Sequence, residues 1–121
     1  MRTGLEQARL PEKPFASSMN VLPHRFRPSV GARLRARVHV ATTGPEPGNW
    51  LIAIDGEQCR IFTGSIPSPD ARVYTDSEIG QTILEGGQSL RSAIESRLLD
   101  YDGDIESLRS VAACLGLENE S

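Results

Sequence analysis

Apolar and polar residues alternate along the segment 33–43, where leucine, alanine and valine are interleaved with arginine and histidine. This period of two predicts a β-strand with one buried face and one solvated, basic face. The alternation returns in 50–55, and the Asp55-Gly56 pair that follows is a strong hairpin signal leading into a third strand at 58–63. A fourth strand is predicted at 71–75.

The apolar period then lengthens and becomes typical of helices. The sequence Thr75-Asp76-Ser77-Glu78 has the spacing of a capping box, which places Thr75 at the N-cap of a helix that ends at Gly86. A second helix at 88–97, a short fifth strand at 98–101 and a final helix from Asp104 complete the pattern. The order ββββααβα predicts an α+β fold, in which helices cover one face of a five-stranded sheet.

The two ends of the chain show no sustained period. Residues 1–20 contain prolines and small polar residues, which predicts a flexible leader. Residues 21–28 predict a short helix bounded by prolines, and residues 118–121 form a polar tail. The folded domain is therefore expected to span 21–117.

Composition and charge narrow the class of protein. A length of 121 residues fits one domain. The formal net charge of −3 is unevenly spread, because residues 1–40 hold eight basic and two acidic residues (+6) and residues 41–121 hold five basic and fourteen acidic (−9). The acidic total argues against a nucleic-acid partner. Neither a membrane span nor a secretory signal is found, so a cytoplasmic protein is expected.

No constellation of catalytic or metal-binding residues is present in the sequence. His24 and His39 have no Cys, Asp or Glu at metal-ligand spacing, and His39 falls on the wet face of the first strand. The acidic run from Asp100 to Glu106 lacks the twelve-residue frame of a calcium loop and suits a helix N-terminus. Cys59 and Cys114 are expected to be buried free thiols. We therefore expect no enzyme activity, no metal and no cofactor.

Three segments resemble the sterol carrier protein type 2 family, in a short bacterial form. They are a Trp-led hairpin (GNWLIAIDGEQCRIFTG), a strand and capped helix (PDARVYTDSEIGQTILEG), and a closing helix–strand–helix unit (SLRSAIESRLLDYDGDIESLRSVAACLG). The resemblance covers residues 21–117. It implies a twisted, mainly antiparallel sheet with an apolar tunnel between the sheet and the helices, and a lipid partner such as a sterol, fatty acid or acyl-CoA.

The apolar stripes of the predicted elements supply candidates for the lining of such a tunnel. Stripes at helical spacing are more commonly plain core, and that alternative stays open. The candidates from the strands and helices are Trp50, Ile52, Ile54, Val73, Ile79, Ile83, Leu84, Leu90, Ile94, Leu108, Ala112 and Leu115.

The basic face of the first strand is a second candidate site. Arg33, Arg35 and Arg37 would suit transient contact with an anionic membrane surface or an acyl-CoA phosphate. The alternative is a solvated face that pairs with the protein's own acidic residues. The family domain is also appended to enzymes such as alkyl sulfatases. A protein-interaction or dimerisation module without a lipid, as a monomer or homodimer, is therefore the alternative function.

Overall fold

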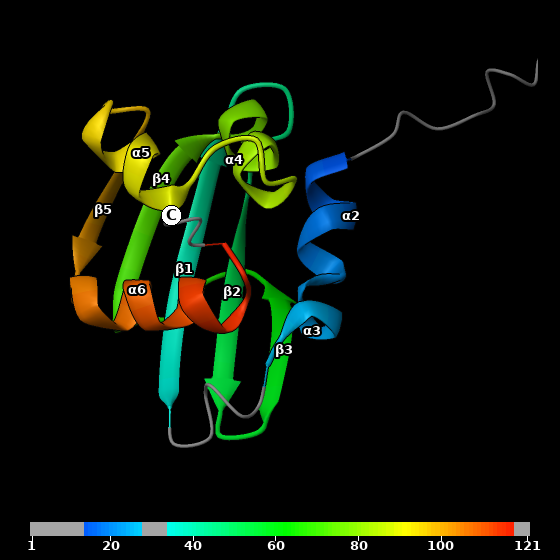
Figure 1. The fold of residues 1–121 in the computed structure, drawn as a ribbon, viewed down its shortest axis with the longest axis vertical. Helices are drawn as coiled ribbons and strands as arrows, with labels where there is room; N and C mark the ends of the chain where they lie inside the picture. Colours follow the sequence, from blue (N-terminus) through cyan, green and yellow to red (C-terminus); the bar gives the residue numbers. More distant parts are fainter. Residues whose placement is uncertain (1–13, 28–33, 118–121) are drawn as a thin grey trace, which may run out of the picture.

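The computed structural model describes residues 14–27 and 34–117 and shows an α+β fold (Figure 1). Its elements are α2 (Pro14–Asn20), α3 (Leu22–Arg25), β1 (Arg35–Thr43), β2 (Gly48–Asp55), β3 (Gln58–Thr63), β4 (Ala71–Asp76), α4 (Ser77–Leu84), α5 (Leu90–Glu95), β5 (Leu99–Gly103) and α6 (Ile105–Cys114). The order in the described part of the chain is ααββββααβα. The predicted order ββββααβα lacks α2, whereas α3 confirms the short helix that was predicted separately within residues 21–28.

The five strands form one mixed sheet in the order β3-β2-β1-β4-β5. Three neighbouring pairs are antiparallel, but β1 and β4 are parallel. The sheet is therefore mainly antiparallel, as expected, but the parallel pair at its centre was not predicted. Because β2 already occupies one edge of β1, β4 pairs along the other edge. Asp70 fixes its start, since Asp70 N donates to Arg37 O (2.8 Å) and Arg37 N donates to Asp70 Oδ2 (2.8 Å).

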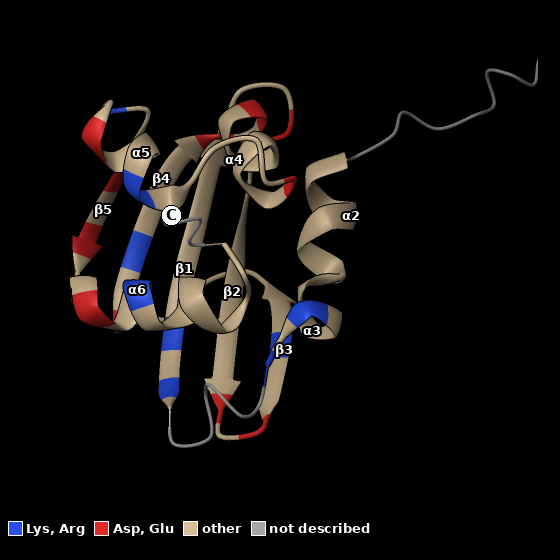
Figure 2. Cartoon of the chain, in the orientation of Figure 1, with Lys and Arg blue, Asp and Glu red and all other residues tan. Residues whose placement is uncertain are grey.

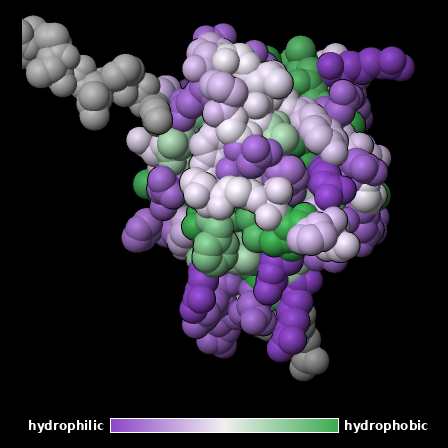
Figure 3. Space-filling model, turned by 180° about the vertical axis from the view of Figure 1, so that it is seen from behind, coloured by the Kyte–Doolittle hydropathy of each residue, from purple (hydrophilic) through white to green (hydrophobic). Residues whose placement is uncertain are grey.

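The helices cover one face of this sheet, and the core lies between the two layers (Figure 1). The inward residues of the strands are apolar and buried, as the period-two pattern predicts. The opposite face carries mostly hydrophilic and neutral residues with smaller hydrophobic patches (Figure 3). The connection after β3 runs over this outer face, where Arg72 donates to the carbonyl of Pro67 (3.1 Å).

The segment predicted as a flexible leader contains a packed helix. Phe15 and Met19 of α2 and Leu22 of α3 are buried in the core, so the prediction is wrong for residues 14–20. These residues stand at i, i+4 and i+7, which places them on one helical face. The Phe15 ring meets Trp50 edge-on at a centroid distance of 4.9 Å, which adds a favourable aromatic contact. Residues 1–13, Arg33 and the tail 118–121 lie outside the described residues.

Helix α4 begins one residue later than the capping-box prediction requires. Asp76 is the N-cap, and its Oδ1 accepts a hydrogen bond from Glu78 N (2.7 Å). Thr75 stays in β4 with its hydroxyl donating to Leu98 O (3.3 Å), so it is not free to cap the helix. Gly86 adopts a φ of 85° after the last turn, as the predicted helix end requires.

Candidate functional site

An apolar cavity of about 60 Å³ lies between the sheet and the helices. Every element except β3 contributes to its wall. The residues that line it are Phe15, Met19, Leu22, Val38, Val40, Ile52, Val73, Thr75, Gly80, Ile83, Leu84, Leu90, Leu99, Leu108, Val111, Ala112 and Leu117. Thr75 alone brings a polar side chain, and its hydroxyl is bound to backbone carbonyls. The cavity therefore offers an occupant dispersion and hydrophobic contacts rather than hydrogen bonds.

The structure brings part of the predicted lining together around this cavity. The residues on its wall are Ile52, Val73, Ile83, Leu84, Leu90, Leu108 and Ala112. Trp50, Ile54 and Leu115 are buried elsewhere in the core, and Ile79 is half-buried against it. Ile94 lies in a separate surface groove. A hydrophobic period identifies a buried face, but it does not say which buried side chains border a void.

Sequence reasoning missed the wall that α2 and α3 provide. Phe15, Met19 and Leu22 all border the cavity, and their i, i+4, i+7 spacing was the signal that could have found them. It also missed the inward residues of β1 and β5 and the end of α6, namely Val38, Val40, Leu99, Val111 and Leu117.

Polar contacts at both ends hold the segment 14–27, here called the N-terminal arm, over the cavity. The Glu46 carboxylate accepts hydrogen bonds from the backbone N–H groups of Phe15 (3.0 Å) and Ala16 (2.8 Å), at the positive end of α2. At the other end, Arg25 donates to the carbonyls of Leu84 (2.6 Å) and Gly116 (3.3 Å). Leu84 is the last residue of α4 and Gly116 follows α6, so both carbonyls lie at helix C-termini, where a cation is favourable.

The size of the cavity limits what it holds in this conformation. An apolar cavity of about 150 Å³ is known to hold a benzene molecule. The present cavity has about 60 Å³, so a long alkyl chain fits only after its walls move apart. The N-terminal arm is one such wall.

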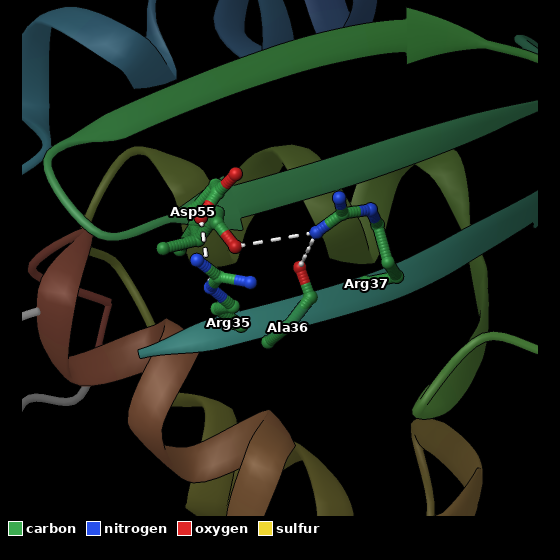
Figure 4. Close-up of polar contacts among 5 residues, drawn as sticks. Arg35, Ala36, Arg37 and Asp55 are labelled. Carbon is green, nitrogen blue, oxygen red and sulfur yellow. Dashed lines mark hydrogen bonds and ion pairs between the residues drawn. The ribbon is translucent and has the colours of Figure 1, made fainter. Parts of the chain in front are cut away.

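The described part of the basic strand face binds the protein's own groups. Arg35 Nε forms an ion pair with Asp55 Oδ1 (3.1 Å), and Arg37 Nη1 donates to the carbonyls of Ala36 (3.2 Å) and Ile54 (3.3 Å) (Figure 4). His39 is not on a wet face, because only 8% of its surface is exposed and its Nε2 lies 2.8 Å from Asn49 Oδ1.

Three further observations concern metal binding, the cysteines and membrane spans. Within residues 14–27 and 34–117, no group of three or more His, Cys, Asp or Glu residues could hold a metal ion. Cys59 and Cys114 are free thiols; Cys114 is buried as expected, but Cys59 is only half-buried. Partial burial, and to a smaller extent the neighbouring Cys114, raises the pKa of Cys59 to about 11. None of the described helices is long and apolar enough to cross a membrane.

Comparison with solved structures identifies the fold. Neither a protein-family model nor a curated protein matches the sequence. Solved structures do match: palmitated SCP2L2 from Aedes aegypti superposes with a TM-score of 0.69 at 13% identity, over 93% of this chain and 100% of that one. The chain has the sterol carrier protein 2 fold. The ubiquinone synthesis protein UbiJ-SCP2 agrees, with a TM-score of 0.65 at 16% identity, over 85% of this chain and 93% of that one.

The same fold also occurs inside a larger enzyme. The sec-alkylsulfatase Pisa1 from Pseudomonas sp. matches 98% of this chain with a TM-score of 0.69 and 18% identity. The match covers only 18% of the sulfatase chain, so the present sterol carrier protein 2 fold corresponds to a small part of that enzyme.

Proposed function

We propose that this domain is a non-enzymatic, cytoplasmic lipid-binding domain, which holds a fatty acid, a sterol or another acyl chain between its sheet and its helices. The observation that carries the proposal is the cavity itself, whose wall is apolar apart from one engaged threonine hydroxyl. A well-packed domain without a ligand would be expected to fill such a space.

The energetics favour an occupant with a long hydrocarbon. Each buried methylene contributes about 0.8 kcal/mol, so a sixteen-carbon chain gives on the order of 12 kcal/mol before costs. The loss of translational and rotational freedom on ligand association costs roughly 4–15 kcal/mol, and moving the cavity walls apart adds to that cost. Measurable but moderate affinity is the expected balance.

The comparisons supply independent support for the class of ligand. The insect proteins SCP2L2 and sterol carrier protein 2 were both studied with palmitate, and they share this fold. Palmitate is therefore the first ligand to test on this chain.

The test is native mass spectrometry of the purified protein, followed by titration with a fluorescent fatty acid and displacement by unlabelled palmitate. Ile83 borders the cavity, whereas Ile79 on the same helix does not, which gives a matched pair of variants. Ile83→Trp should abolish saturable binding, and Ile79→Trp should leave it in place. Absence of binding to the wild-type protein would overturn the proposal.

One observation favours a second function, that of an interaction module. The Pisa1 match shows this fold as a minor part of a large enzyme chain. With its small cavity left empty, the domain would then serve association rather than transport. A stable dimer or heterocomplex of a lipid-free protein, measured by light scattering, would favour this alternative.

A further inference from the structure

A surface groove lies against the outer side of the proposed lipid cavity. It has a volume of about 190 Å³ and runs between α5, β5 and α6. Its apolar part is formed by Leu90, Ile94, Tyr101 and Ile105, and the Tyr101 side chain remains 40% exposed. The groove therefore combines an apolar surface with access from solvent.

Leu90 is the residue that borders both the groove and the buried cavity. Only 6% of its surface is exposed, so the side chain that borders both spaces is itself buried. It is the first residue of α5, a helix of six residues that follows Gly86 and Gly87. A small shift of this short helix would join the groove to the cavity.

Two arginines and one glutamate line the groove beside its apolar residues. Arg91 forms an ion pair with Glu95 at 3.5 Å, one helical turn away. Arg109 of α6 also lines the groove, and within the described residues its guanidinium has no hydrogen-bond or ion-pair partner. Figure 2 shows these basic segments on α5 and α6, while acidic residues lie on β5. The planar fork of an arginine suits two-point binding of a carboxylate.

We propose that this groove binds the carboxylate of a long-chain fatty acid through Arg109, while the hydrocarbon passes Leu90 into the cavity. The inference rests on the proposed function and adds to it a head-group site and a route for the hydrocarbon. The carboxylate stays hydrated at the surface beside its counter-charge, and only the alkyl chain is desolvated. That division avoids burying an ionised group in a cavity without hydrogen-bond donors.

The head-group site is tested by comparing palmitate with its uncharged methyl ester in the displacement assay. Arg109→Gln should weaken palmitate binding about tenfold, the lower end of what a charge-assisted hydrogen bond contributes, and should leave the ester unchanged. Arg60→Gln is the matched control, because Arg60 is exposed on β3 and does not line this groove. Equal effects on acid and ester, or none on either, would overturn the site.

The route is tested with a pair of leucine variants. Leu90 and Leu84 both border the cavity, but only Leu90 also borders the groove. Leu90→Ala should speed fatty-acid uptake in stopped-flow measurements several times more than Leu84→Ala does. Equal rates in the two variants would refute the route. If the wild-type protein binds neither palmitate nor its ester, the proposed function itself fails. That outcome can be distinguished from palmitate binding that the Arg109→Gln substitution leaves unchanged, which would refute only the head-group site.

Discussion

Filling the cavity should stabilise the protein and impair lipid binding at the same time. Ala112 on α6 borders the cavity and is only 1% exposed. At about 24 cal/mol per Å³, a cavity of about 60 Å³ corresponds to about 1.4 kcal/mol of lost packing. Ala112→Val adds two methyl-sized groups at about 0.8 kcal/mol each, and the helix propensity of valine subtracts about 0.5 kcal/mol. The expected gain in unfolding free energy is therefore about 1 kcal/mol.

Ala93→Val is the matched control for this prediction. Ala93 is also a helical alanine, with 0% of its surface exposed, but it does not border the cavity. Overpacking there should cost about 1–3 kcal/mol. Urea unfolding followed by the fluorescence of Trp50, the one tryptophan of the chain, measures both variants. Equal destabilisation by the two substitutions would show that no void lies beside Ala112.

Three further predictions test the parts that surround the cavity. Gly80→Ala would place a Cβ 2.6 Å from Phe15 Cε1 and displace the Phe15 ring. The free energy of unfolding in urea should therefore fall by about 1–2 kcal/mol, although alanine has the better helix propensity. Glu46→Gln removes the charge and one acceptor at the start of α2, so hydrogen exchange at the Phe15 amide should accelerate about tenfold, as expected for a lost helix cap. Burial raises the pKa of Cys59 from its ordinary value of 9.0 to about 11, so as the pH rises the unfolded thiol loses its proton before the folded one does. The free energy of unfolding should therefore fall between pH 9 and 11. In urea unfolding, Cys59→Ala should flatten that fall.

The strands and the hairpin could be predicted because local sequence dictates them. Gly56 adopts a φ of 64°, as the Asp-Gly turn requires, and the third strand occupies Gln58–Thr63 as predicted. The period of two in β1 likewise predicted which of its side chains point into the core.

Features set by distant contacts could not be predicted from local pattern. The parallel pairing of β1 with β4 depends on where the connection crosses the sheet. His39 is likewise buried beside Asn49, although local pattern placed it on a wet face. The position of the void depends on how side chains from nine elements and the segment after α6 fit together. The position of Phe15 depends on Gly80 and Trp50, which are distant in sequence and form the surface against which its ring packs.

The most direct test of the central claim is NMR with carbon-13-labelled palmitate, which detects contacts between the alkyl chain and protein methyl groups. Binding in the cavity predicts saturable one-to-one binding and nuclear Overhauser contacts from the chain to the methyl groups of Ile83 and Leu108. Absence of binding, or contacts confined to the outer face of the sheet around the exposed Phe62 of β3, would contradict the proposed lipid site.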